Sequence, residues 1–137
     1  MATYNYGIDK TLIAAVDLSS YQYYVMVAGS TAGECTVATG HGASAIGILQ
    51  NDPTAGEEAV VRVFGFSKVR ATTEAAASTL KAWNPVKSSS TGMITGFVTS
   101  TAGSANWQLG LSTETYSTGS GAYLEMFVTP CWKNGVA

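Results

Sequence analysis

The stretch from Ala45 to Arg70, AIGILQNDPTAGEEAVVRVFGFSKVR, decides how this chain folds. The apolar run from Ile46 to Leu49 is followed by Asn-Asp-Pro, which stops a strand because proline cannot donate a ladder hydrogen bond. After Gly56, valines alternate with basic residues, which is the period-two pattern of a strand with one buried face. The stretch therefore predicts two β-strands joined by a turn.

Two phenylalanines break this alternation. Phe64 and Phe66 share parity with Arg62 and Lys68, the residues expected on a solvated strand face, rather than with the valines. Gly65 between them marks a bulge in one interpretation. In the other, the sheet is covered on both faces at this point.

Short runs of β-forming residues recur along the rest of the chain, separated by turns rich in glycine, serine and threonine at roughly ten-residue spacing. This pattern predicts an all-β fold, a small β-barrel or sandwich-like domain. In the last run Leu124, Met126 and Val128 form the core face, and Pro130 is expected to end the ladder. Only residues 72–82 have helix character, for one or two turns at most. The predicted strands outside the central stretch are 11–16, 21–27, 34–39, 93–98, 107–113 and 122–129.

The length of 137 residues predicts one domain. We expect an N-terminal extended arm at 1–10, a β-rich domain at 11–132 and a C-terminal tail at 133–137. Charged residues make up only 12% of the chain, about half the usual share of roughly 25%, which suits a surface that packs against other protein. The net charge of −2 argues against a general nucleic-acid partner.

Composition and motifs also argue against membranes, metals and catalysis. The N-terminus lacks the order of a signal peptide, and no apolar run is long enough to span a bilayer. Cys35 and Cys131 are not in a CxxC motif and are expected to be reduced, so no metal or other cofactor is predicted. His41 lies in a glycine-rich turn without a partner nucleophile, and Glu57 and Glu58 point to opposite faces of a strand. We therefore expect a protein that is not an enzyme.

The central stretch resembles the signature of the capsid cement, or head-decoration, proteins of tailed bacteriophages. The resemblance continues in VDLSSYQY (16–23), LKAWNPV (80–86), QLGL (108–111) and LEMFVTP (124–130), and so covers nearly the whole chain. Its specificity comes from the order and spacing of several short motifs. Trp83 departs from the pattern, because the family usually has a small residue near this position.

The resemblance implies a non-enzymatic virion protein, made in the host cytoplasm, on the exterior of the phage capsid. It implies binding to the outer surface of the mature head, where the protein stabilises the shell by bridging neighbouring major capsid protein subunits. It also implies self-association, as a homotrimer. Two other interpretations stay open: another virion module, such as a tail tube or fibre, and a carbohydrate-binding β-domain that uses Trp83, Trp107 or Trp132 as stacking platforms.

Aromatic residues on the arm, on the wrong-parity face or beside loops are the candidates for a protein interface, since aromatic side chains are enriched at interfaces. The alternative for each of them is ordinary core packing. The candidates are Tyr4, Tyr6, Phe64, Phe66, Trp83 and Trp107.

Overall fold

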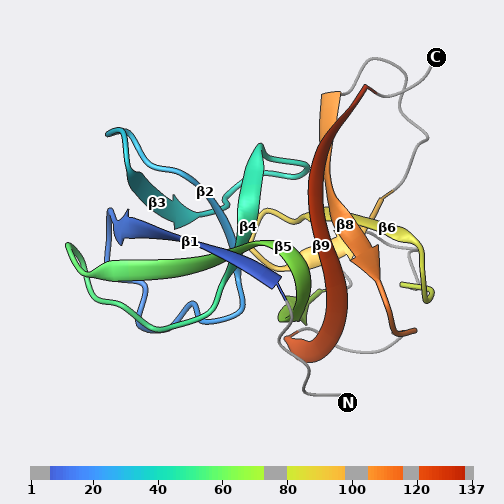
Figure 1. The fold of residues 1–137 in the computed structure, drawn as a ribbon. Coiled ribbons are helices and arrows are strands. Elements are labelled where there is room, and N and C mark those ends of the chain that lie inside the picture. Colours follow the sequence, from blue (N-terminus) through green and yellow to red (C-terminus); the bar gives the residue numbers. More distant parts are fainter. Residues whose placement is uncertain (1–6, 73–79, 98–104, 116–120, 135–137) are drawn as a thin grey trace.

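The computed structural model describes residues 7–72, 80–97, 105–115 and 121–134, and these residues form an all-β fold without a helix (Figure 1). The all-β prediction is confirmed. Both strands predicted from the central stretch are present, with a turn between them. The strands are β1 (Gly7–Ala14), β2 (Val25–Ala28), β3 (Glu34–Val37), β4 (Ala45–Leu49), β5 (Glu58–Ala71), β6 (Pro85–Ser88), β7 (Ile94–Gly96), β8 (Ala105–Ser112) and β9 (Ala122–Asn134).

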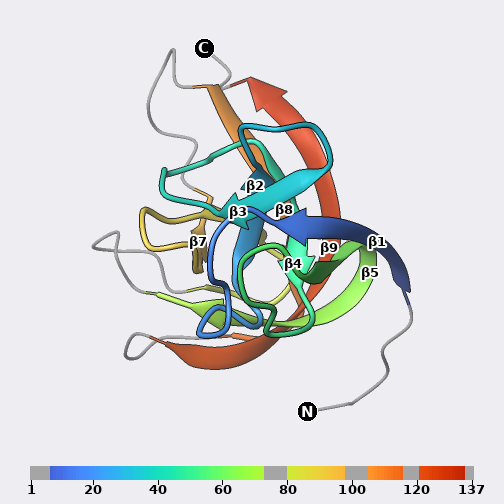
Figure 2. The same cartoon turned by 90° about the vertical axis from the view of Figure 1, so that its left-hand side faces the viewer.

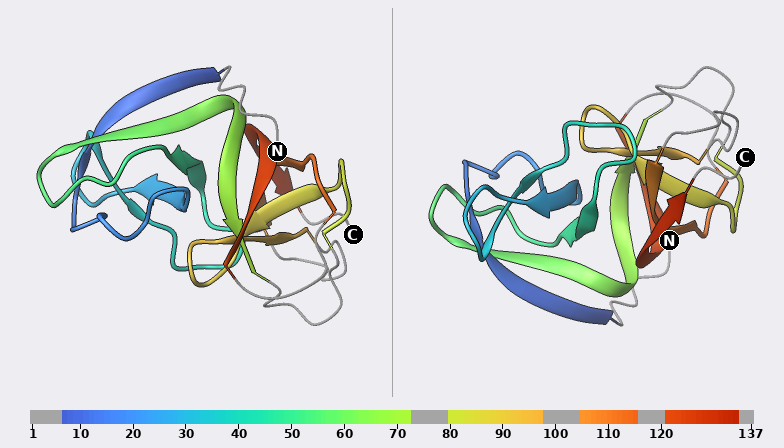
Figure 3. Two further views of the ribbon diagram at one scale, coloured as in Figure 1. Left: turned by 90° about the horizontal axis from the view of Figure 1, so that it is seen from below. Right: turned by 90° about the horizontal axis from the view of Figure 1, so that it is seen from above.

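The strand pairings close two rings that share β5. One ring runs β1-β3-β2-β4-β5 and returns to β1, and the other runs β5-β7-β6-β8-β9 and returns to β5. Seen from below and from above, β5 passes from one half of the molecule to the other (Figure 3). The fold is thus a pair of small barrel-like halves joined by one long strand.

The strand β5 changes partners in its middle. Its first half pairs with β1, which lies along it (Figure 2), and its second half pairs with β9. Gly65 is the point of exchange, because it pairs with Gly7 of β1 and with Val128 of β9. Its φ of 108° is one that residues with a side chain rarely adopt. The glycine therefore permits the bend that the two-ring topology requires.

Each half has its own hydrophobic core, and the odd-numbered residues of β5 contribute to both. Ala59 and Val61 pack in a cluster with residues of β1 to β4. Val69 and Ala71 pack in a second cluster that contains the inner residues of β9. The predicted core face of the last strand is confirmed, because all three of its members are buried; they are Leu124, Met126 and Val128.

Strand β6 was not predicted, and the predicted bounds of the second and the last strand are wrong. The strand expected from residue 21 begins only at Val25, because Tyr23 has a φ of 67° and the chain before it forms turns. Pro130 does not end the last strand, which continues to Asn134. Its missing N–H is tolerated because it lies beside a shift in the register of β8 and β9, where the ladder is interrupted.

The predicted arm and helix fall largely outside the described residues. Strand β1 begins at Gly7, so residues 7–10 of the expected arm belong to the sheet, while residues 1–6 are not described. Most of the expected helix, 73–79, also lies outside the description. Cys35 is buried, Cys131 is half-buried, and the two do not pair. Within the described ranges, no helix is long and apolar enough to cross a membrane.

Candidate protein-interaction surface

Phenylalanines form a cluster on the outer side of the β5–β9 pair, in which Phe64 is exposed while Phe66 and Phe127 are half-buried. Phe66 and Phe127 are direct cross-strand partners, and their ring centroids are 5.2 Å apart. Phe64 lies edge-on to the same Phe127 ring at 5.3 Å and remains 47% exposed. Ile8, the β1 partner of Phe64, is 63% exposed. A contiguous exposed group of this kind is typical of a contact surface for protein.

A β-bulge in β5 directly precedes these phenylalanines. Ile8 pairs with Phe64, but the next residue, Asp9, pairs with Arg62, so Val63 is the extra residue of β5. The bulge and the bend at Gly65 increase the local twist of the strand without moving its odd-numbered residues off the buried side. The sequence placed a bulge at Gly65, whereas the bulge lies two residues earlier, at Val63. The outward parity of both phenylalanines is confirmed, because the odd-numbered residues on either side of them face inward.

Arg62 is not on the solvated face where the sequence pattern placed it. Its side chain is only 6% exposed and forms an ion pair with Asp9 of β1. One guanidinium nitrogen donates to an Asp9 carboxylate oxygen at 3.2 Å, and another donates to the backbone oxygen of Phe66. The Arg62 side chain thus spans the bend, because it starts before Gly65 and contacts both Asp9 of β1 and Phe66 beyond the bend.

The outer face continues along β5 with two cations that lie among tyrosine rings. The Arg70 guanidinium carbon is 4.6 Å from the centroid of Tyr123 and 5.9 Å from that of Tyr24. The Lys68 amine is 5.7 Å from the Tyr23 centroid and 5.9 Å from the Tyr123 centroid. These separations are within the range of cation–π attraction. We call this group the cation–tyrosine end of the outer face.

The remaining interface candidates do not join this surface through any described ring contact. Trp83 is 61% exposed in the segment before β6 and has a φ of 65°, the left-handed geometry for which a small residue is better suited. Trp107 is half-buried on β8, and its backbone N–H donates to the backbone oxygen of Gly42 at 3.1 Å. Tyr4 and Tyr6, and the side chain of Trp132, lie outside the described residues.

Several residues of the outer face were not among the candidates. Tyr123 and Phe127 alternate with the core residues of the last strand, so their outward parity was readable from the sequence. Ile8 was assigned to an arm, and Tyr23 to a strand buried on both sides. Tyr23 lies beside Lys68 because its backbone oxygen accepts the N–H of Arg70, and a contact between such distant residues cannot be predicted from a local pattern.

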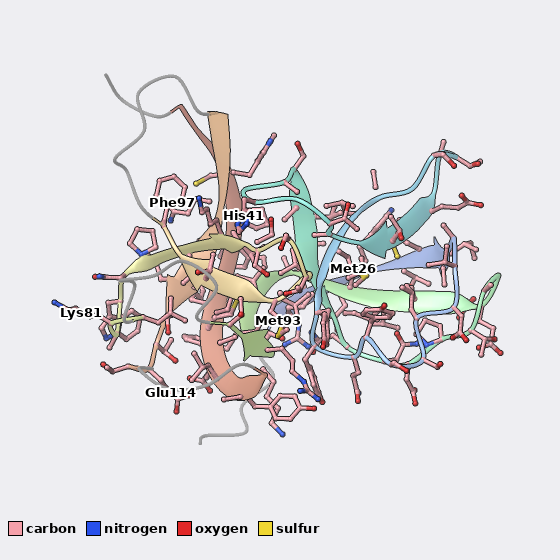
Figure 4. All side chains as sticks on the ribbon, turned by 180° about the vertical axis from the view of Figure 1, so that it is seen from behind. Met26, His41, Lys81, Met93, Phe97 and Glu114 are labelled. Carbon is pink, nitrogen blue, oxygen red and sulfur yellow. The ribbon has the colours of Figure 1, made fainter. Side chains whose placement is uncertain are left out.

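The described residues offer no constellation for metal binding. No group of three or more histidine, cysteine, aspartate or glutamate side chains is close enough together there to hold an ion. The carboxylate of Glu57 accepts the backbone N–H of Thr54 at 2.8 Å, and this hydrogen bond lowers its pKa. Exposed His41 lies in the same half of the molecule as Lys81 and Glu114 (Figure 4). The described surface has its aromatic and cationic contacts on the outer face of β5 and β9, which is the candidate site.

Two rings of strands that share one bent strand define the class of fold. No protein-family model and no curated protein sequence matches the chain. Among solved structures, the fold is similar to that of the head fiber gp8.5 N base in bacteriophage phi29. The TM-score is 0.60 at 13% sequence identity, and the match covers 89% of this chain and 93% of the other. At this identity, the likeness establishes the fold.

Proposed function

We propose that this chain is a structural protein of a phage virion, without catalytic activity, that binds the outer surface of the mature head. The observation that carries the proposal is the fold shared with a phage head-fiber base over nearly the full length of both chains. Exposed Ile8 and Phe64 support it independently, because a protein that works by contact needs an apolar surface that its own core does not use.

The proposed mechanism is selective binding. The protein bridges neighbouring major capsid protein subunits only in the expanded lattice, where those subunits together form its site. A ligand that binds one state and not another stabilises that state by mass action. Each copy contributes little, but the contributions of many equivalent sites add over the shell.

The experiment that tests the proposal uses heads of the phage that encodes this chain, prepared from a deletion of its gene. Purified protein added to expanded heads is expected to cosediment with them and to appear as regular density on the outer surface by electron cryo-microscopy. Immature heads serve as the matched control and are expected to bind little. Equal binding to both states would contradict the selective mechanism, and binding to neither would refute the function.

A second candidate is the base module of a fiber on the head, and it is favoured by the structural neighbour, which is the base of a phage head fiber. The same micrographs separate the two candidates. A bridging protein gives compact density at every equivalent position of the lattice. A fiber base gives density from which a longer projection extends.

We also propose that the protein associates with itself as a homotrimer, as the resemblance to cement proteins implies. Multi-angle light scattering on the purified protein is expected to give three times the chain mass. A monodisperse monomer at micromolar concentration, together with single-copy density on the head, would refute the trimer and leave head binding intact.

A further inference from the structure

The cation–tyrosine end of the outer face holds two positive charges without a described carboxylate at ion-pair distance. The ion pair on this side of the sheet is Arg62 with Asp9. Glu125 lies directly opposite Lys68 in the register, yet its carboxylate accepts the hydroxyl of Thr113 at 3.2 Å instead. Lys68 and Arg70 are therefore positioned by aromatic rings rather than by an opposite charge.

The tyrosine rings hold the two cations in a defined arrangement. Arg70 lies over Tyr123 and also donates to the backbone oxygen of Gly121 at 2.9 Å. Tyr23 stands edge-on to Tyr123, with centroids 5.8 Å apart, and Lys68 is close to both rings. Side chains that are already ordered lose less conformational entropy when a ligand binds. The arrangement thus favours an anionic group from another molecule.

The outer face changes character along β5 from apolar to cationic. Phe64 and Phe66 precede Lys68 and Arg70 at every second position, so all four side chains point to one side. Neighbouring positions of this series are separated by about 6.6 Å in an extended strand. A partner that covers both ends needs an apolar group and an anionic group at a matching separation.

We propose that the outer face of β5 and β9 is the surface that contacts the partner, and that the partner segment is an acidic, partly apolar stretch of protein. Its carboxylate lies between Lys68 and Arg70, and its apolar side chain covers Phe64 and Phe66. In an extended segment these two groups are two to four residues apart on one face. The inference rests on the proposed function, because it assigns the capsid-contacting surface and the chemistry of the segment that meets it.

The phenylalanines of the outer face, Phe64 and Phe66, favour protein over nucleic acid as the occupant. A phosphate backbone has no apolar group to place on that cluster, and a chain of net charge −2 repels a polyanion. Cations on a surface of this kind act mainly on orientation and on the rate of association. They therefore fix which way the protein sits on its partner.

The test compares two charge reversals that change the net charge equally. Lys68→Glu alters the cation–tyrosine end. Lys81→Glu alters an exposed lysine in the segment before β6, at the end of the molecule away from Met26 (Figure 4). Wild type and both variants are titrated onto expanded heads that lack the protein. We expect Lys68→Glu to weaken binding at least about tenfold, which is about 1.4 kcal/mol, and Lys81→Glu to leave it within about twofold.

Two further variants keep the test decisive if Lys68→Glu unfolds. Lys68→Gln removes the charge without reversing it, and Phe64→Ser removes the apolar contact at a half-exposed position. Both are expected to weaken binding, and cooperative thermal unfolding shows that each variant is folded, with a lower midpoint for Phe64→Ser because it loses the ring contact with Phe127. Raising the salt concentration should weaken wild type more than Lys68→Gln, because screening acts on the charge that the variant lacks.

The outcomes separate this inference from the proposed function. If wild type fails to bind heads, the function fails and the inference fails with it. If wild type binds and the folded Lys68 and Phe64 variants bind equally well, the function stands and the outer face is not the contact surface. Binding of a DNA oligonucleotide that depends on Lys68, with head binding unaffected, would also overturn the acidic protein segment as occupant.

Discussion

Replacing Asp9 by alanine removes the carboxylate that neutralises a buried arginine at the bend of β5. Arg62 is 5% exposed as a residue, and Asp9 supplies both oxygens that face its guanidinium from β1. In the Asp9→Ala variant the backbone oxygen of Phe66 is the described acceptor that remains. The charge then lies in a poorly solvated position with little compensation, so the folded state loses stability.

The size of the loss follows from how far the pair is removed from water. Breaking a fully buried ion pair costs about 3–5 kcal/mol. The Asp9 side chain is 36% exposed, so solvent compensates part of this cost, and we expect about 2–3 kcal/mol in the free energy of unfolding. For a chain of this size, each kcal/mol lowers the unfolding midpoint by about 4 °C. The expected shift is therefore about 8–12 °C.

Differential scanning calorimetry and urea unfolding at neutral pH measure this loss. Asp52→Ala serves as the matched control, because it removes an exposed aspartate with no described side-chain hydrogen bond, and it should stay within about 0.5 kcal/mol. Adding Arg62→Met to Asp9→Ala should restore much of the stability, since the uncompensated charge is then gone. A loss below about 1 kcal/mol for Asp9→Ala, or an additive double variant, would refute the reasoning.

Three other perturbations test the fold. Gly47→Ala should destabilise by about 2 kcal/mol or more in urea, because its Cβ would overlap the backbone oxygen of Arg62, whereas Gly40→Ala, with open space around it, should be nearly neutral. The thiol of Cys35 should resist alkylation at pH 8 until urea unfolds the chain, since burial raises its pKa; rapid labelling of the native protein, located by mass spectrometry, would contradict its placement. The lowered pKa of Glu57 stabilises the fold above the ordinary glutamate pKa, and this contribution disappears as pH falls through the lowered value. Glu57→Gln should therefore flatten the acid limb of a midpoint-against-pH curve, and an unchanged limb would contradict the hydrogen bond.

The sequence carried enough information to predict all the described strands except β6, and to predict the buried face of β5 and β9. Alternation along β5 and β9 separated inward valines and leucines from outward residues, because side chains of a strand alternate between faces. The same alternation placed the apolar residues Phe64 and Phe66 on the outward side, which made them interface candidates. A glycine between two residues of unexpected parity predicted a bulge at Gly65, but the bulge lies at Val63 and Gly65 is paired on both sides.

The parts that the sequence did not yield depend on contacts between distant residues. Arg62 shares parity with Lys68, so local pattern gives both the same environment, and only the pairing with Asp9, 53 positions away, distinguishes them. The positive φ of Tyr23 depends in the same way on what surrounds it, since its N–H bonds the oxygen of Leu49 and its oxygen receives the N–H of Arg70. Long-range pairing overrides the local preference for strand at such positions.

The bend of β5 connects stability with the proposed contact. Both cores are filled by odd-numbered residues of this strand, so its even-numbered phenylalanines are left outside by the register rather than by a lack of apolar partners. Phe64 alone leaves 47% of its surface uncovered, which is about 95 Å² for a side chain of roughly 200 Å². Covering that area would contribute about 2 kcal/mol at about 25 cal/mol per Å², a contribution that the isolated chain does not realise. The bend at Gly65 lets one strand contribute to two cores, and the register of that strand leaves an apolar surface outside both of them. Burial of that surface stabilises the protein only when another molecule covers it.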